Sequence, residues 1–306
     1  MAEVGLVRFG AAALAVAAVV MKPYSSKFSK RRFTQPQLLA ILCLMRFEDW
    51  TFREAEVRLH EHSELRRALG LERAPDYTTL HCFMKRLTAG VIASVLEETV
   101  RRMPPGKPGG TTVAVDATGL APGAVSVFFV KRVKDRGEGF PWRRWTKWLV
   151  VVDVPRRLIL AQSAKYGPTN DSATLRPLVS AAASTGEIEF VLADAEFDSE
   201  LNHIYVRDHI GASAVIPAKR GKKGWRKQGM RAEMERNFPA GLYALRNAVE
   251  SLFSAVKRKL SSRAPGRSLA TQVLQALLLG VAYNIYRLRP RFPGVQVIYH
   301  FRPSYA

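Results

Sequence analysis

The segment Thr111-Thr-Val-Ala-Val-Asp116 decides the fold, because it opens the part of the chain in which strands replace helices. Its β-branched residues favour a strand, which is expected to end at Asp116. Ile188-Glu-Phe-Val-Leu-Ala-Asp194 repeats the arrangement of a buried apolar strand followed by an aspartate. Ligands of open α/β sheets collect near strand ends at topological switch points, so both aspartates are candidate site residues.

The surrounding segments predict an α/β domain, a mixed sheet with flanking helices. Two strands form a hairpin through Pro155. The expected strands, besides those that end at the two aspartates, are residues 125–130, 148–152, 157–161 and 212–216. The expected helices are residues 172–183, 199–209 and 268–288. Antiparallel strands come first and alternating strands and helices follow, as in a sheet covered by helices.

The first hundred residues predict helices. Residues 10–21 are too short to span a bilayer and are expected to form a packed helix. A second helix covers residues 37–45. Thr51-Phe-Arg-Glu54 is a capping box that begins a helix to about His60, and Asp76 is the expected N-cap of a helix through Leu87. Basic helix ends suit a DNA-binding module, although a helical cap on the next domain is an equal alternative.

A stretch rich in Pro and Gly, Arg101–Gly110, marks a domain boundary. We therefore expect an all-helical N-terminal region over residues 1–105, for binding DNA ends, and a catalytic domain over residues 110–306. The two cysteines, Cys43 and Cys82, are too few for a disulfide scaffold and are expected to be core residues in a reducing compartment.

Composition indicates a polyanionic partner. The net charge is +21 and the pI is about 10.4, which points to nucleic acid first and to an anionic membrane surface second. The apolar fraction of 47% is enough for a packed core and argues against disorder. No phosphate-loop motif occurs, so ATP dependence is not expected.

The segment Leu242–Leu260 contains no Pro or Gly and predicts one helix. At about 100° per residue, four polar residues share one stripe: Tyr243, Arg246, Glu250 and Lys257. The apolar residues form a separate packing arc: Leu245, Val249, Leu252, Phe253, Val256 and Leu260. A carboxylate flanked by cations suggests a place where metal and phosphate meet.

Asp116, Asp194 and Glu250 come from distant segments and are predicted to converge. Carboxylates that meet either shift their pKa values or bind a divalent cation. Mg²⁺ takes oxygen ligands and leaves room for a substrate phosphate, and a pair of ions can activate a nucleophile and stabilise a leaving oxygen. Asp153 and Asp198 are expected to be capping or turn residues instead.

These motifs resemble those of the insertion-sequence transposases that carry an Asp-Asp-Glu triad on a ribonuclease H-like domain. The resemblance runs from about Phe33 to Arg289. It rests on Tyr-x2-Arg-x3-Glu-x6-Lys at 243–257 and on three further segments: Pro75-Asp-Tyr-Thr-Thr-Leu80, Val113-Ala-Val-Asp-Ala-Thr-Gly119 and Ala193-Asp-Ala-Glu-Phe-Asp-Ser199. It implies metal-dependent cleavage at terminal inverted repeats and strand transfer to target DNA.

The resemblance also implies roles for individual residues. Asp116, Asp194 and Glu250 would be the catalytic metal ligands, for two Mg²⁺ or Mn²⁺ ions. The residues that would hold transposon-end DNA are Tyr243, Arg246 and Lys257. It further implies double-stranded DNA partners, a homodimer in the synaptic complex, no membrane partner, and a prokaryotic cytoplasmic protein associated with the nucleoid. Family members often have Gly-Tyr where this chain has Glu196-Phe197, which places an additional acid near the site.

The sequence contains three other patterns of basic, aromatic or histidine residues. The basic segment Lys219–Lys227 is expected to contact phosphate through Lys222, Lys223 and Arg226. Trp142, Trp145 and Trp148 alternate with basic residues and suit base stacking and strand-edge packing equally well. His60-Glu-His62 is expected to be a solvated helix end, because the two rings diverge by about 200° on a helix.

Two alternatives to a transposase remain open at this stage. One is a catalytically silent DNA-binding protein derived from a transposase, and the other is a ribonuclease H-like nuclease without strand transfer. Nicking in the presence of Mg²⁺ separates the first from an enzyme, and joined products separate the second from a transposase.

Overall fold

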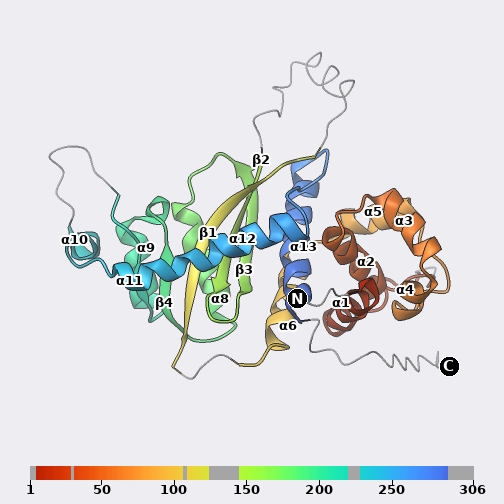
Figure 1. Ribbon diagram of the computed structural model, residues 1–306, viewed down its shortest axis with the longest axis horizontal. Coiled ribbons are helices and arrows are strands. Elements are labelled where there is room, and N and C mark those ends of the chain that lie inside the picture. The colour runs from red at the N-terminus through yellow and green to blue at the C-terminus, as the bar shows by residue number, and fades with distance from the viewer. Residues whose placement is uncertain (1–4, 29–30, 106–108, 124–144, 220–227, 289–306) are drawn as a thin grey trace, which may run out of the picture. The chain divides into compact units, whose positions relative to one another are not determined.

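The computed structural model describes residues 5–28, 31–105, 109–123, 145–219 and 228–288, which form two compact units (Figure 1). One unit comprises Met1–Thr99 and Val281–Ala306, and the other is Val100–Gly280. Helix α13 (Leu269–Leu288) belongs partly to each unit. The prediction from the sequence placed all of residues 110–306 in one domain. The strand expected at 125–130 lies outside the described residues.

The described N-terminal residues are helical. The helices are α1 (Leu6–Val20), α2 (Gln35–Phe47), α3 (Phe52–Glu61), α4 (Ser63–Ala68), α5 (Tyr77–Arg86) and α6 (Ala89–Arg101). Their starts follow from local capping, because the Thr51 hydroxyl accepts from the N–H of Glu54 while the Glu54 carboxylate accepts from the N–H of Thr51. The Asp76 carboxylate caps α5 at the N–H of Thr78. Both caps were predicted, whereas α4 and α6 were not.

Helix α1 is a packed helix, as predicted. Its small residues from Gly10 to Ala13 are buried, and the ring of Phe9 stacks on that of Phe47 with centroids 4.3 Å apart. Cys43 is buried on α2, and burial raises the pKa of its thiol to about 12. Cys82 is exposed on α5, so its prediction as a core residue is wrong, because it falls on the face of α5 opposite Leu80 and Met84.

The second unit contains a five-stranded mixed sheet in the order β3-β2-β1-β4-β5. The strands are β1 (Thr111–Leu120), β2 (Trp145–Asp153), β3 (Leu158–Gly167), β4 (Ile188–Ala193) and β5 (Ser213–Val215). The pairs β1–β2 and β2–β3 are antiparallel, and the pairs β1–β4 and β4–β5 are parallel. The predicted mixed sheet and the β2–β3 hairpin are therefore confirmed.

A buried carboxylate stabilises the hairpin turn. Asp153 accepts hydrogen bonds from the backbone N–H and the Nε of Arg156, both at 2.8 Å, and from the hydroxyl of Thr111 at 3.2 Å. The side chain of Asp153 is fully buried. It therefore joins the turn to the start of β1, which agrees with the turn role expected for this aspartate.

Strand β1 continues four residues beyond Asp116, whereas the sequence predicted that it would end there. Its pairing with β2 extends to Leu120, but its parallel pairing with β4 stops at Val115. The antiparallel neighbour keeps β1 extended after β4 has ended. Asp116 thus marks the end of the parallel ladder and not the end of the strand.

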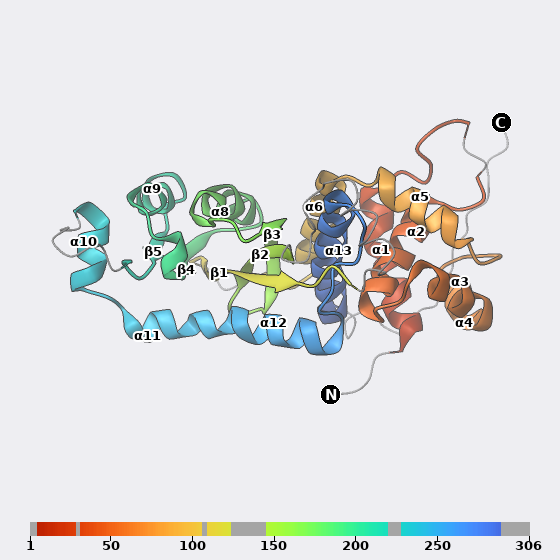
Figure 2. The ribbon, with the colours of Figure 1, turned by 90° about the horizontal axis from the view of Figure 1, so that it is seen from above.

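Helices cover both faces of the sheet (Figure 2). Helix α8 (Leu175–Ala183) covers one face, where Val113, Val115 and Val191 belong to the core beneath it. Helix α12 (Asn247–Lys259) runs along the other face. Further helices are α9 (Glu200–Ile204), α10 (Gly229–Arg236) and α11 (Ala240–Tyr243). The alternation of side chains along a strand separates the two faces.

Trp148 belongs to the face beneath α12. Its ring lies 5.7 Å from that of Phe253 between centroids, its side chain is fully buried, and its indole N–H donates to Gln162 at 2.9 Å. This position supports the packing interpretation of Trp148. Trp142 lies outside the described residues.

The predicted single helix over 242–260 is interrupted. Helix α11 ends at Tyr243, a 3-10 turn covers Ala244–Arg246, and α12 follows. A 3-10 turn advances about 120° per residue and so rotates the residues before α12 relative to a continuous helix. Leu245, predicted on the packing arc, is therefore 46% exposed, whereas the rest of the arc is buried as predicted.

Among the described helices, α13 is the one long and apolar enough to cross a membrane. Of its most apolar window, 61% is buried inside the structure. Buried core helices of water-soluble proteins have the same composition. Within the second unit, its Leu277 carbonyl accepts a hydrogen bond from Gln162 on β3 at 2.8 Å.

Trp145 lies against two glycines of the neighbouring strands. A Cβ atom on Gly167 would lie 2.6 Å from its indole ring, and one on Gly119 would lie 3.0 Å away. We therefore expect Gly167→Ala to lower the free energy of unfolding by about 1–3 kcal/mol, because the ring must shift. Urea denaturation measures this change.

The clash has an internal control. In a Trp145→Ala background, Gly167→Ala should cost little. Gly90→Ala should not destabilise the wild-type protein, because Gly90 is helical and a Cβ there would meet only the Thr88 hydroxyl, at an ordinary contact distance of 3.9 Å. An equal cost of Gly167→Ala in both backgrounds would show that the ring is not the cause.

Candidate active site

Asp116 and Asp194 lie side by side at the end of the parallel ladder. Val115 pairs with Ala193, and each aspartate is the next residue along its own chain segment. Val115 and Ala193 face the core beneath α8, so alternation directs both aspartates towards the face of α12. The sequence prediction that these two residues converge agrees with this geometry.

Each aspartate also orders its own backbone. Oδ1 of Asp116 accepts from the N–H of Ala117 at 2.7 Å. Oδ1 of Asp194 accepts from the N–H of Glu196 at 2.7 Å and caps the 3-10 turn that follows β4. These bonds hold one oxygen of each carboxylate and leave the second one to face the site.

The pKa of Asp116 is raised above its ordinary value. Burial is the main cause, and the negative charge of Asp194 adds to it. The N–H of Ala117 and the guanidinium of Arg246 act in the opposite direction without cancelling these effects. The two aspartates are thus close enough to repel each other, a situation that a cation between them would relieve.

Arg246 joins Asp116 to Glu250. Its Nη1 lies 2.7 Å from Oδ2 of Asp116, and its Nη2 lies 2.5 Å from Oε1 of Glu250. Burial lowers the pKa of Arg246. The charges of Asp116, Tyr243 and Glu250 raise it by a larger amount, so the net shift of the pKa is upward. The guanidinium is therefore fixed as a cation between two of the three candidate metal ligands.

Tyr243 completes this cluster. Its ring centroid lies 5.7 Å from Cζ of Arg246 and 5.0 Å from the ring centroid of Phe238. Burial is the first cause that raises the pKa of its phenol, and the charges of Asp194 and Asp116 also raise it, whereas Arg246 lowers it. The contact with Arg246 thus links Tyr243 to the cluster.

Lys257 is further along α12. It is exposed on the last turn of the helix, seven residues after Glu250, which corresponds to about 10 Å along the axis. The structure therefore brings together five of the predicted site residues and leaves Lys257 at the edge of the cluster. Lys222, Lys223 and Arg226 lie outside the described residues.

Packing and hydrogen bonds hold α12 against the sheet on both sides of Glu250. Its buried residues Val249, Leu252 and Val256 pack on the sheet face, and the guanidinium of Arg157 donates to the carbonyl of Ala248 at 3.4 Å. After the helix, the N–H of Ala264 donates to the carbonyl of Ala121 at 2.7 Å. These contacts fix α12 along β1 at both ends of its path.

Within the described ranges, no three His, Cys, Asp or Glu side chains are grouped so that they hold a metal ion as they stand. The candidate donors nevertheless suit Mg²⁺ or Mn²⁺, since all three are carboxylates and carboxylate oxygens are the preferred ligands of these ions. Arg246 occupies the space between Asp116 and Glu250, which accounts for the open arrangement.

Asp198 anchors the segments on either side of residues 220–227. Its carboxylate accepts from Nε and Nη2 of Arg231, at 2.9 and 2.7 Å, and from the N–H of Lys219 at 2.8 Å. Glu200 accepts from the N–H of Met230 at 2.9 Å. The residues before and after 220–227 are therefore bonded to Asp198 and Glu200, which follow Asp194 by only a few residues. No local pattern in the sequence predicted the role of Arg231, because its partner Asp198 lies far away along the chain.

The additional acid Glu196 faces a cation of its own. Nζ of Lys147 lies 3.6 Å from Oε2 of Glu196 and also forms an ion pair with the buried Asp171. Lys165 lies 3.1 Å from the other oxygen of Asp171. Lys147 and Lys165 are opposite each other on β2 and β3, so this network stabilises the sheet beside the site.

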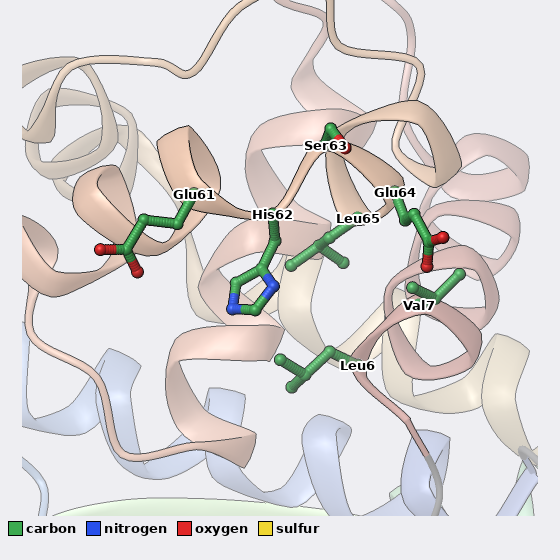
Figure 3. Close-up of a pocket in the computed structure, with 7 residues that line it drawn as sticks. All are labelled: Leu6, Val7, Glu61, His62, Ser63, Glu64 and Leu65. Carbon is green, nitrogen blue, oxygen red and sulfur yellow. The ribbon is translucent and has the colours of Figure 1, made fainter.

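A hollow of about 270 Å³ lies in the helical unit (Figure 3). Its lining residues are Leu6, Val7, Glu61, His62, Ser63, Glu64 and Leu65. The two acids make it unsuitable for phosphate. His60 and His62 are exposed near the end of α3, as predicted for a solvated helix end.

Asp198 generates a prediction about stability and pH. Burial alone would raise its pKa, but hydrogen bonds from His203, Arg231 and the Lys219 backbone outweigh burial and lower it well below its ordinary value. The resulting stabilisation is complete above the unfolded-state pKa of about 4 and is lost as the pH falls towards the folded-state value. We expect Asp198→Asn to cost about 2 kcal/mol at neutral pH.

Urea denaturation between neutral pH and about pH 3 checks this linkage. The difference in unfolding free energy between wild type and Asp198→Asn should shrink below about pH 4. Asp208→Asn is the control, since Asp208 pairs with Arg207 at an exposed position and should contribute little at any pH. A difference for Asp198→Asn that stays constant over the whole range would contradict the assignment.

Comparison with known proteins gives the family. The chain resembles, at 10% identity and a TM-score of 0.47, a piggyBac transposase solved as a synaptic complex with hairpin DNA, and the match covers 94% of this chain and 74% of that one. No curated protein sequence matches. The family model described as "Transposase DDE domain" matches residues 107–285. More than half of the chain matches this model, and the chain therefore belongs to the transposase DDE domain family.

Proposed function

We propose that this chain is the transposase of an insertion sequence, which cleaves DNA at terminal inverted repeats and joins the freed ends to target DNA. The observation that carries the proposal is that Arg246 links Asp116 to Glu250, while Asp194 lies on the strand end next to Asp116. Asp116 and Asp194 follow paired residues of two parallel strands, and Glu250 is separated from Asp116 by one guanidinium group. The sheet order β3-β2-β1-β4-β5 supports a ribonuclease H-like catalytic domain.

Asp116, Asp194 and Glu250 are the residues that would hold the metal ions. Their donor atoms fit Mg²⁺ or Mn²⁺, and the mutual repulsion of Asp116 and Asp194 favours a cation between them. When bound, a pair of such ions would supply water activation and charge neutralisation for in-line cleavage of a phosphodiester. The protein's part is to fix the carboxylates on rigid elements and to orient the DNA strand.

The cations of α12 and the turn before it provide the DNA-orienting groups. Tyr243 ends α11, Arg246 ends the 3-10 turn, and Lys257 lies on the last turn of α12. Guanidinium and ammonium groups bind phosphate oxygens, and a phenol donates to them. The overall charge of +21 attracts the DNA without regard to sequence.

The helical region, residues 1–105, is the proposed binding module for the transposon ends. The exposed face of α5 carries residues suited to a DNA groove: Thr78, Lys85 and Arg86. Two transposon ends must meet before strand transfer, so the proposed active form is a homodimer on double-stranded DNA. We place the protein in the prokaryotic cytoplasm, associated with the nucleoid.

The carboxylates give the first test. Asp116→Asn, Asp194→Asn and Glu250→Gln should each reduce strand cleavage by at least about a thousandfold, because each removes a charge needed at the reacting phosphate. End binding should stay largely intact. A cleavage assay on DNA carrying the inverted repeats that flank the gene, with Mg²⁺ or Mn²⁺, measures the loss beside a gel-shift assay.

Glu189→Gln serves as the matched control, because Glu189 is an exposed acid on β4 outside the cluster. Cleavage at the wild-type rate by a cluster variant would remove that residue from the site. Binding without any cleavage by the wild-type protein would favour the silent DNA-binding alternative, and nicked ends that never join target DNA would favour a nuclease.

The basic residues give a second test. Arg246→Ala and Lys257→Ala should each weaken DNA binding and reduce the slope of log affinity against log salt concentration by about one, as expected for the loss of one phosphate contact. Arg258→Ala is the control, since Arg258 lies about 80° around the helix from Glu250 and its Nε donates to the carbonyl of Ser254 at 3.3 Å. Fluorescence anisotropy over a salt series measures the slopes, and an unchanged slope for Lys257→Ala would refute its phosphate contact.

A further inference from the structure

One guanidinium neutralises two carboxylates of the candidate site. The fork of Arg246 places Nη1 on Asp116 and Nη2 on Glu250, at 2.7 and 2.5 Å. Its side chain is 16% exposed, as is that of Asp116, whereas that of Glu250 is 53% exposed. The pair with Asp116 is thus shielded from water, and the pair with Glu250 lies at the solvent boundary.

We infer that Arg246 is a place-holding cation: it occupies the space between Asp116 and Glu250 in the metal-free protein and leaves it when a divalent ion binds. This inference rests on the proposed function, because it takes these carboxylates to be the metal ligands. It assigns to Arg246 a second role besides contact with DNA.

Competition for the same oxygens supports this role. Oδ2 of Asp116 and Oε1 of Glu250 each accept a short charge-assisted hydrogen bond from the guanidinium. The same two oxygen atoms are those that Asp116 and Glu250 would offer to a divalent ion, whose ligands are carboxylate oxygens. The two cations compete for these atoms, so metal binding requires the guanidinium to move.

Arg246 also compensates the charge of Asp116 in the metal-free protein. Without a cation, Asp116 would face Asp194 with its charge uncompensated in a largely buried position. Arg246 supplies that compensation from the turn just before α12, and its position there keeps it within reach of both acids. The charge of Asp116 is therefore compensated in the folded protein even when no metal is bound.

The displaced guanidinium becomes available to a phosphate. A phosphate group that binds Arg246 weakens its hold on the carboxylates, and an ion that binds the carboxylates releases Arg246 towards phosphate. Coupling of this kind is reciprocal, so DNA should raise metal affinity by the same factor by which metal raises DNA affinity. Arg246 would then make metal loading follow DNA binding.

A purely supporting role for Arg246 makes the opposite prediction. If the guanidinium braced Asp116 and Glu250 in the geometry that an ion needs, its removal would loosen the site and weaken metal binding. The sign of the change in metal affinity therefore separates the two roles.

The experiment measures Mn²⁺ binding to the full-length protein by electron paramagnetic resonance of the free ion. We expect Arg246→Ala to bind Mn²⁺ about tenfold more tightly than wild type, which corresponds to about 1.4 kcal/mol. Arg246→Lys should lie between the two, because a single ammonium cannot bridge both carboxylates. Arg258→Ala, on the same helix but with its Nε bonded to the carbonyl of Ser254, should match wild type.

Two further measurements keep the result interpretable. Asp194→Asn must abolish Mn²⁺ binding, so that the signal of the free ion stays at full intensity, which locates the ion at this site. Thermal unfolding in EDTA should show a lower Tm for Arg246→Ala than for wild type, and added Mn²⁺ should raise the Tm of Arg246→Ala by the larger amount, since binding to the folded state alone stabilises it. This readout also establishes that the variant is folded.

Coupling to DNA is measured with a short random-sequence duplex at low salt. The duplex should tighten Mn²⁺ binding to wild type several-fold, and this gain should largely disappear in Arg246→Ala. Equal or weaker Mn²⁺ binding by Arg246→Ala, together with a site that Asp194→Asn abolishes, would overturn the place-holder and leave the proposed function standing. Absence of Mn²⁺ binding in both wild type and Arg246→Ala would overturn both.

Discussion

The parallel ladder between β1 and β4 ends at the pair Val115–Ala193, and the candidate site depends on that end point. Two like charges follow the last pair directly, on the sheet face that α12 covers. Their separation is set by the spacing of neighbouring strands and not by side-chain flexibility. Glu250 of α12 and the guanidinium of Arg246 complete the cluster. The three carboxylates outnumber the one guanidinium, so the cluster has a net negative charge that attracts a small cation.

The acids of the second unit divide into two groups by the cations around them. Asp153, Asp171 and Asp198 are buried and are paired with Arg156, Lys147 and Arg231 in ion pairs that hold turns and strands together. Such pairs are costly to break. The cluster at the end of the ladder differs, because two carboxylates follow paired residues of adjacent strands and their like charges remain close to each other. That imbalance distinguishes a candidate catalytic group from a structural one.

Local sequence signals predicted much of this structure. The capping box at Thr51 and the cap at Asp76 depend on residues within one helical turn, and the strands before Asp116 and Asp194 depend on short apolar runs. The 3-10 turn before α12 and the exposure of Leu245 were missed, because helical periodicity assumes a constant rotation per residue. The bridge from Arg246 to Asp116 and the pair of Arg231 with Asp198 join distant segments, and no pattern in one sequence specifies which distant partner an arginine meets.

The attachment of Lys219 and Arg231 to one aspartate has an evolutionary consequence. Since the chain leaves and returns at the same carboxylate, residues can be gained or lost between these two points without moving the sheet, α12 or the neighbouring acids. A change of length between these two points therefore leaves the spacing of Asp116, Asp194 and Glu250 unaltered.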